Sequence, residues 1–221
     1  MKYEIIKDQQ ELDKFIEWLP DLKEYEKFYV ALFARKKYDK ALQSTSSDKM
    51  QLKRLLVTKE NMVHKIKQLE IEYGLYKLKN TIATQQSLAI YITPNPRCMI
   101  KAHNDMLLRT AKAITTGNYF YNLHAEAMSC IQRAKSKSYV VDFDIDTKDV
   151  DLGDINYILP YTAYNILETK GGYHILVKPE EAPKNNWYKE IVNKFKCDQI
   201  GDQMIPVPGC TQGNFIPKFI E

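Results

Sequence analysis

The stretch Tyr139-Val140-Val141-Asp142-Phe143-Asp144-Ile145-Asp146 alternates between apolar and acidic side chains. Successive side chains of an extended strand point to opposite faces, so Asp142, Asp144 and Asp146 share one face and the apolar residues share the other. Carboxylates on one face repel one another unless cations neutralise them. The pattern therefore predicts a strand that binds a hard divalent cation, and Mg²⁺ is the usual partner of carboxylates that also position phosphates.

Length and composition favour a single domain. The chain has 221 residues, of which 44% are hydrophobic, enough to bury one substantial core. We expect an N-terminal α/β and helical portion at residues 1–137 and a motif-bearing portion at residues 138–221. The sequence has no run of about 18 apolar residues, and its start lacks the apolar segment of a signal peptide. A cytoplasmic protein with no membrane partner is therefore predicted.

The cysteines are widely spaced, form no Cys-x-x-Cys pair, and lie at Cys98, Cys130, Cys197 and Cys210. In a cytoplasmic protein this spacing predicts buried free thiols rather than disulfides. The alternative is a zinc site built from Cys98 and His103 with Cys130 or His124, but that spacing fits no standard zinc pattern.

Hydrophobic periodicity alternates between strand and helix along the first two thirds of the chain. Strands are predicted at residues 1–7, 27–35 and 88–93, and a polar loop at residues 43–48. Asp8 offers an N-cap to a helix that Pro20 ends. Further helices are predicted at residues 58–73, 102–115, 123–135 and 185–195, and an irregular Pro- and Gly-rich tail follows.

Two apolar segments, residues 164–169 and 173–177, flank Lys170-Gly171-Gly172. Glycines at the turn predict a β-hairpin. An antiparallel hairpin excludes a purely parallel sheet, so the predicted fold class is α+β.

Two further residues could act with the aspartate strand. His174 follows the glycine turn, where a backbone can approach a phosphate and an imidazole can donate a hydrogen bond to a triphosphate oxygen. Asp202 could supply a third acid to a two-metal site. The alternatives are an ordinary sheet histidine and a turn aspartate that follows Gly201.

Net charge is +4, and basic residues gather at residues 35–37, 49–79 and 133–137. Such stretches can follow a phosphate backbone. Solvated helix faces are the alternative for each stretch.

Three elements, in this order, resemble the motifs of the archaeo-eukaryotic primase superfamily, above all the primase-polymerases of phages, plasmids and mobile elements. Val140-Val141-Asp142-Phe143-Asp144 is similar to a hydrophobic strand that ends in Asp-x-Asp. Glu168-Thr169-Lys170-Gly171-Gly172-Tyr173-His174 is similar to the turn that leads to histidine, with one residue's difference in spacing. Asp202 before Val207-Pro208-Gly209-Cys210-Thr211 looks like the third motif, although Cys210 interrupts the usual Gly-Thr. The resemblance covers about residues 139–219, and residues 90–97 add a weaker similarity upstream.

The resemblance implies an RNA-recognition-motif-like catalytic sheet, mixed or antiparallel, packed on an N-terminal α/β unit. It implies Asp142, Asp144, His174 and Asp202 as catalytic residues. Asp142, Asp144 and Asp202 would bind two Mg²⁺ or Mn²⁺ ions. Asp146 is the alternative ligand, because Asp144-Ile145-Asp146 fits Asp-x-Asp equally well.

The same resemblance implies that the incoming nucleotide is held by His174, Lys170, Gly171 and Gly172. Arg97 and Lys218 are further candidate phosphate contacts, with solvated surface positions as the alternative for both.

The implied function is template-dependent nucleotidyl transfer: a DNA primase or primase-polymerase that makes or extends primers from NTPs or dNTPs on single-stranded DNA. A replicative helicase or another replication protein is an expected partner, and a bacterial cytoplasm with a phage or mobile-element gene is the expected setting. A metal-dependent nuclease using the same carboxylates and a non-catalytic nucleic-acid-binding accessory protein are the alternative functions.

Overall fold

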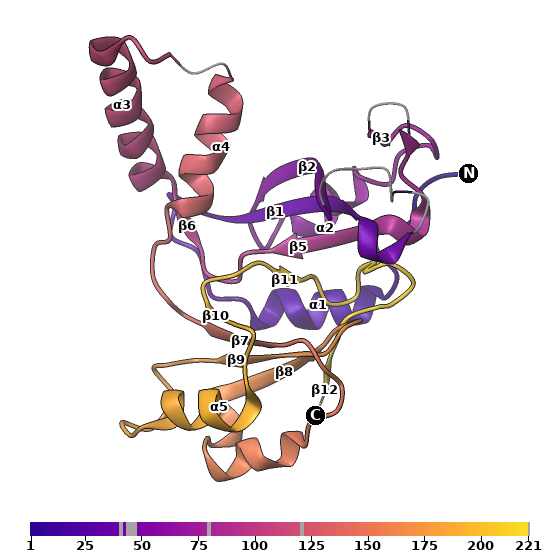
Figure 1. Cartoon of the computed structure of the whole chain (residues 1–221), viewed down its shortest axis with the longest axis vertical. Coiled ribbons are helices and arrows are strands. Elements are labelled where there is room, and N and C mark those ends of the chain that lie inside the picture. Colours follow the sequence, from indigo (N-terminus) through magenta and orange to yellow (C-terminus); the bar gives the residue numbers. More distant parts are fainter. Residues whose placement is uncertain (40–41, 43–47, 79–80, 120–121, 221) are drawn as a thin grey trace.

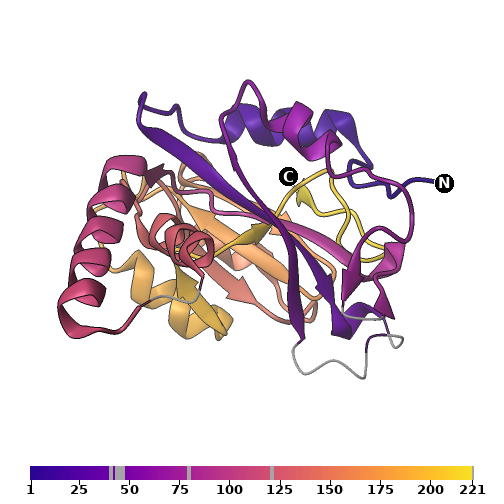
Figure 2. The same cartoon turned by 90° about the horizontal axis from the view of Figure 1, so that it is seen from above.

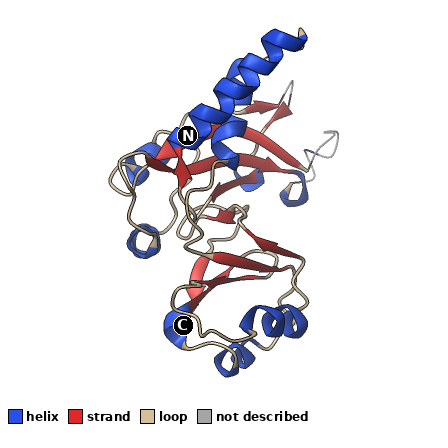
Figure 3. Ribbon diagram, turned by 90° about the vertical axis from the view of Figure 1, so that its left-hand side faces the viewer, coloured by secondary structure: helices blue, strands red, loops and turns tan. Residues whose placement is uncertain are grey.

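The computed structural model of the protein describes residues 1–39, 42, 48–78, 81–119 and 122–220. Within them, two five-stranded antiparallel sheets lie one above the other, with helix α1 (Gln9–Trp18) between them and further helices on their outer faces (Figures 1 and 3). The α+β class predicted from the sequence is confirmed. None of the described helices is long and apolar enough to cross a membrane.

Sheet 1 is the upper layer in Figure 1, and its strands run in the order β11-β5-β1-β2 with β6 beside β1. Its members are β1 (Glu26–Arg35), β2 (Lys49–Val57), β5 (Leu88–Ile92), β6 (Arg97–Cys98) and β11 (Ile205–Pro206). Helices α1 and α2 (Met62–Lys67) pack in the same buried cluster as strands β1 and β5. A short hairpin of β3 (Lys77–Leu78) and β4 (Thr81–Ile82) also belongs to this portion of the chain.

Sheet 2 is the lower layer, and its strands run in the order β10-β7-β9-β8-β12. Its members are β7 (Val141–Ile145), β8 (Tyr164–Glu168), β9 (Tyr173–Val177), β10 (Gln199–Gly201) and β12 (Lys218–Ile220). Helix α5 (Trp187–Phe195) covers the face that points away from sheet 1 (Figure 1). Seen from above, sheet 1 lies over sheet 2 (Figure 2).

Helix α1 ties the two layers together. The side chain of Asp8 caps it by accepting a hydrogen bond from the backbone N–H of Glu11, as the sequence predicts. The indole N–H of Trp18, at the other end of the helix, donates to Asn165 Oδ1 on β8 over 2.7 Å. Phe15 packs with Phe219 of β12. The largest buried cluster accordingly contains side chains from both portions of the sequence.

The alternation of β7 has the consequence expected from the sequence. Phe143 and Ile145 are buried in a second apolar cluster together with Ile191 and Phe195 of α5. Asp142 is fully buried on the opposite face, where it meets β9. One strand therefore supplies apolar side chains to the core and carboxylates to the other side of the sheet.

Helices α3 (Met99–Thr116) and α4 (Leu123–Arg133) form a hairpin that projects above sheet 1 (Figures 1 and 3). Met128 and Ile131 anchor α4 on the outer face of the sheet, against Tyr29. The N-caps of the two helices are Cys98 and Asn122, and the side chain of each accepts a backbone N–H.

In the N-terminal portion one expectation was wrong and one strand was not predicted. The helix expected at residues 58–73 is confined to α2, although Met62, Ile66 and Leu69 are buried as its apolar spacing predicts. Strand β2 was not foreseen. It is an edge strand that has only β1 as a partner, and it carries lysines at Lys49 and Lys53, so its sequence lacks the continuous apolar character of β1.

The two ends of the chain also differ from expectation. Residues 1–7 are extended and bury Tyr3 and Ile5, but they form only the isolated bridges Lys2↔Glu72 and Ile6↔Cys210 instead of a regular strand. The tail is less irregular than predicted, because it contains β10, β11 and β12. Most of the loop expected at residues 43–48 lies outside the described residues.

Candidate functional site

Asp142 and His174 form a buried pair between adjacent strands. Nδ1 of the imidazole lies 2.9 and 3.0 Å from the two carboxylate oxygens of Asp142. Nε2 lies 3.6 Å from Oδ1 of Asp144, the residue directly opposite His174 in the β7–β9 register. Burial alone would lower the pKa of His174, but the charge and hydrogen bond of Asp142, with the charges of Asp144 and Asp146, raise it. The histidine is thus positioned by one carboxylate and directed at a second.

Asp144 lies among other acids. Burial raises its pKa, the charge of His174 opposes this rise, and the charges of Asp142, Asp146 and Asp198 add to it. The side chain of Asp198 was not foreseen as part of the site; its Oδ2 accepts the backbone N–H of Asp146 over 3.0 Å. A raised pKa among like charges is the situation that a bound cation relieves.

A cleft of about 120 Å³ opens beside these acids, and residues of both sheets line it. Asp144, Asp146 and His174 line its sheet 2 side. Arg35 and Lys37 line its sheet 1 side. The remaining lining side chains are mainly polar and come from both sheets and the tail: Lys49, Tyr91, Thr169, Gly171, Gln199, Gln203, Met204, Pro206 and Gln212. One wall is therefore acidic and the facing wall is basic.

Arg35 is held rigidly on the basic wall. Its Nε and Nη2 donate to Oδ2 of Asp48 over 3.0 and 2.8 Å, and its Nη1 donates to the hydroxyl of Tyr91. The guanidinium also lies over the rings of Tyr38 and Tyr91. Burial works to raise the pKa of Asp48, but the backbone N–H of Lys37 and the charge of Arg35 hold that pKa below its usual range. These contacts fix the end of β1 where it meets the cleft.

The glycine turn between β8 and β9 packs directly on the end of β7. A methyl group added to Gly172 would lie 1.9 Å from the carbonyl oxygen of Ile145 and 2.7 Å from the amide nitrogen of Thr147, so only glycine fits. The neighbouring Gly171 lines the cleft. The turn is closed by Thr169, whose hydroxyl accepts the backbone N–H of Gly172.

Lys170 has an exposed side chain whose Nζ lies 4.6 Å from the centre of the Tyr38 ring, and its backbone N–H donates to Gln212 Oε1 over 2.7 Å. It sits beside the cleft and is not one of the residues that line it. Lys218 lies on the surface, 3.9 Å from a carboxylate oxygen of Glu168, in agreement with the alternative given for it.

Asp202 lies next to β7, because the preceding Gly201 pairs with Asp142. Its carboxylate is engaged by two residues from the segment that follows β5. Nη1 of Arg97 contacts its Oδ2 at 2.5 Å, and Nδ2 of Asn95 donates to its Oδ1 over 2.9 Å. Both expectations for Arg97 were wrong: its side chain is only 2% exposed, so it is neither a solvated cation nor available to a phosphate.

The expected set of three ligands, Asp142, Asp144 and Asp202, is therefore divided among different partners. Among the described residues, no three His, Cys, Asp or Glu side chains are grouped closely enough to hold a metal ion. Asp144 and Asp146 both line the cleft, and their oxygens suit one hard divalent cation. Of the residues considered as ligands, these two fit a cation best.

The four thiols are free. Cys98, Cys130 and Cys210 are buried, as predicted, and Cys197 is half-buried. Burial, with smaller effects of nearby carboxylates, raises the pKa of Cys197 to about 11.

Comparison of the chain with family models, curated proteins and solved structures found no match. The functional argument consequently depends on the motifs and on the geometry of the cleft.

Proposed function

We propose that the protein is a template-dependent nucleotidyltransferase, a DNA primase or primase-polymerase that makes or extends primers from NTPs or dNTPs during replication. One observation carries the proposal: a single cleft places the carboxylates of Asp144 and Asp146 opposite the cation of Lys37, beside the ion pair of Arg35 with Asp48. A nucleoside triphosphate with a divalent cation has both complementary charges. Residues of the first two motifs that resemble the primase superfamily, Asp144, Gly171 and His174, line the same cleft.

The side chains have separate roles in this proposal. Lys37 binds the negative triphosphate tail, Arg35 in its ion pair with Asp48 fixes the end of β1 beside it, and Gly171 leaves room. Asp144 and Asp146 would hold Mg²⁺ or Mn²⁺, which when bound lowers the cost of charge that develops on the phosphate oxygens. His174 donates a hydrogen bond from Nε2 toward the nucleotide, while Asp142 keeps Nδ1 protonated and fixes the ring.

The reaction needs positioning more than a protein nucleophile. The 3′-hydroxyl oxygen of a primer forms a bond to the α-phosphorus and its proton passes to water, while the bond to the bridging oxygen breaks and pyrophosphate leaves with the electron pair. Residues that hold the triphosphate on one wall and the reacting phosphorus near the other meet this need. No side chain of the cleft has to form a covalent bond.

The proposal also includes the kind of sheet that carries the site. A catalytic sheet like that of an RNA-recognition motif is supported by the antiparallel pairing of β7 with β9, which sets the Asp-x-Asp strand beside the histidine strand. We propose that the enzyme acts in the cytoplasm on single-stranded DNA, with a replicative helicase or another replication protein as partner.

The test is primer synthesis by the purified chain with Mn²⁺, a single-stranded template and labelled nucleotides. We expect a product that requires template and is lost in Asp144→Asn. The matched control is Asp149→Asn, an exposed acid a few residues further on, which should leave synthesis unchanged. Absence of any Asp144-dependent product, from protein shown to be folded, would refute the proposal. Incubation of labelled DNA with metal and no nucleotide separates cleavage from synthesis.

A non-catalytic nucleic-acid-binding accessory protein is the second candidate. It is favoured by one observation: Asp142 and Asp202 are already engaged by His174 and Arg97. In that case Asp144→Asn would leave the binding of single-stranded DNA intact, and neither wild-type nor variant protein would incorporate nucleotides.

A further inference from the structure

A second hollow lies on the outer face of sheet 1, between α4 and the edge strand β2. Its volume is about 450 Å³. The lining is polar and offers hydrogen-bonding groups along its length, from Arg54, Tyr119, Asn122, Ala125, Glu126, Ser129 and Gln132. Tyr119 leaves 69% of its surface exposed at one side. Single-stranded nucleic acid is bound by this combination of a cation, neutral donors and an accessible aromatic ring.

The hollow continues toward the cleft that holds the acids. Nε2 of Gln132, one of its lining residues, lies 3.9 Å from Sδ of Met204, which lines the cleft. On β2, Arg54 pairs with Ala31 and Lys49 pairs with Arg35. Ala31 and Arg35 are four residues apart on β1, so Arg54 and Lys49 lie on the same face of the sheet. The outer face of sheet 1 thus connects the two hollows.

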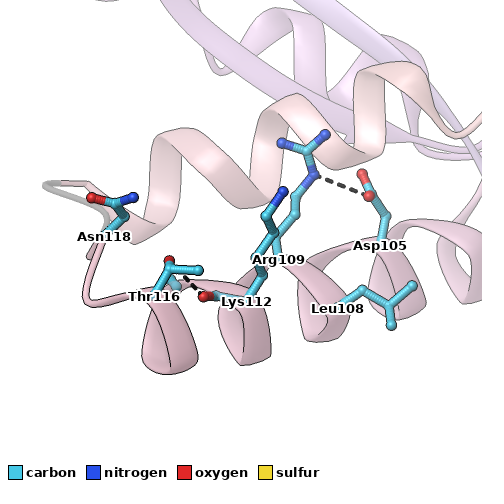
Figure 4. A pocket seen from close by; sticks show the side chains of 7 residues that line it. Asp105, Leu108, Arg109, Lys112, Thr116 and Asn118 are labelled. Carbon is cyan, nitrogen blue, oxygen red and sulfur yellow. Dashed lines mark hydrogen bonds and ion pairs between the residues drawn. The ribbon is translucent and has the colours of Figure 1, made fainter.

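Glu126, the one acid that lines the hollow, is paired with arginines of α3 and α4. Oε1 of Glu126 accepts a hydrogen bond from Nη1 of Arg109 over 2.7 Å, and Nη2 of Arg133 lies 3.8 Å from the same oxygen. Arg109 also donates from Nε to Asp105 over 3.0 Å, as Figure 4 shows on the α3 side of the hairpin. Two arginines and two acids form this cluster, so Glu126 presents little net negative charge to a phosphate in the hollow.

We propose that this hollow is the template groove: it holds the single-stranded DNA that runs to or from the cleft. The inference depends on the proposed function for the identity of its ligand. Arg54 contacts a backbone phosphate, Ser129 and Gln132 donate hydrogen bonds to the backbone, and the ring of Tyr119 stacks on a base. Contacts of this kind are independent of sequence, as a template site requires.

The test measures binding of a fluorescently labelled single strand of about 16 nucleotides, the upper end of common site sizes, by anisotropy without metal or nucleotide. Arg54→Glu should weaken binding about tenfold or more at moderate salt, and should reduce the slope of log affinity against log salt by about 0.7 for the lost phosphate contact. Lys189→Glu, the same charge change on the exposed surface of α5, is the matched control and should change neither value.

A second variant keeps the test decisive if Arg54→Glu does not fold. Gln132→Glu adds a negative charge inside the groove without touching Arg54, and it should weaken binding of the strand in the same direction. Nucleotide binding by both variants should equal that of the wild type. If Arg54→Glu and Gln132→Glu, both folded, bind the strand as the wild type does, the groove is overturned.

The outcomes separate the two proposals. Template-dependent synthesis that persists together with wild-type strand affinity in both variants would overturn the groove and leave the proposed function standing. Strand affinity that falls in both variants, while the wild type shows no Asp144-dependent synthesis, would support the groove as a nucleic-acid site and refute the enzyme.

Discussion

The imidazole of His174 is held between two carboxylates of the neighbouring strand, with Nδ1 on buried Asp142 and Nε2 3.6 Å from Asp144. The two acids of the first Asp-x-Asp therefore differ in task. Asp142 orients the histidine, and Asp144 faces the cleft. In the proposed enzyme, Asp142 is a positioning residue and Asp146 takes the place at the cleft that the sequence pattern alone gave to Asp142.

Substitution of His174 should lower stability, because the buried carboxylate of Asp142 would lose its partner. His174→Ala leaves the carboxylate of Asp142 without its partner in a fully buried position, so we expect a loss of about 3 to 5 kcal/mol in the free energy of unfolding. Urea unfolding with tryptophan fluorescence measures it. The double variant with Asp142→Asn should lose less than the sum of the single changes, because no unpaired charge remains. Additive losses would contradict this coupling.

Two adjacent glycines provide a matched pair of substitutions. Gly172→Ala places its methyl group 1.9 Å from the Ile145 carbonyl oxygen, so the turn must move away from β7, at a cost of roughly 1–3 kcal/mol or more. Gly171→Ala meets only Asp146 Oδ1, at 3.7 Å, and should leave stability nearly unchanged. Thermal unfolding of the two variants checks the contrast. Equal melting temperatures would contradict the close contact between Gly172 and the end of β7.

The basic wall makes a prediction about nucleotide binding. Lys37→Met removes one cation from the cleft, and the loss of a charge-assisted contact to a triphosphate should weaken binding by about tenfold. Lys189→Met on α5 is the control and should bind nucleotide as the wild type does. Titration with a fluorescent triphosphate analogue gives both affinities. A variant Lys37→Met with unchanged affinity would place the triphosphate elsewhere.

The lowered pKa of Asp48 makes stability depend on pH. A depressed folded pKa stabilises the protein above the unfolded value, near 3.8, and this stabilisation is lost as pH falls through the folded pKa. The difference in unfolding free energy between wild type and Asp48→Asn should therefore be largest near neutral pH and shrink in acid. Because the carboxylate is 45% exposed, salt should reduce the difference as well. A difference that stays constant with pH would rule out the ion pair with Arg35 as its source.

Thiol chemistry should distinguish the cysteines. Cys98, Cys130 and Cys210 are buried, and the raised pKa of Cys197 leaves little thiolate at pH 8. We expect the native chain to react slowly with a disulfide reagent, at Cys197 first, and the denatured chain to react at all four. Rapid native labelling of a buried cysteine, located by peptide mass, would contradict the packing around it.

The sequence predicted those elements that are determined by residues close to one another along the chain. The alternation in β7 and the glycine turn between β8 and β9 define those strands, and a capped apolar stripe defines α1. The pairing of Asp144 with His174 depends on strand register, which local pattern alone does not give. The basic stretch at residues 35–37 was identified from the sequence, but its position opposite the acids was not, because that position depends on how sheet 1 packs on sheet 2.

The proximity of Asp202 to the aspartate strand was anticipated, and its ion pair was not. Arg97 reaches it from a position 105 residues earlier, and that contact exists only once β10 lies beside β7 and β6 beside β1. A buried arginine also needs a partner of opposite charge, which no local sequence feature identifies.

Residues 202–204 run directly from β10 in sheet 2 to β11 in sheet 1, a short strap across the mouth of the cleft. A connection of three residues does not allow sheet 1 and sheet 2 to move far apart at this point. The short connection therefore limits how far the acidic and basic walls can separate, and the proposed nucleotide has to fit a cleft of limited width. Residues inserted into this connection would relax that limit without replacing any residue of the acidic or basic wall.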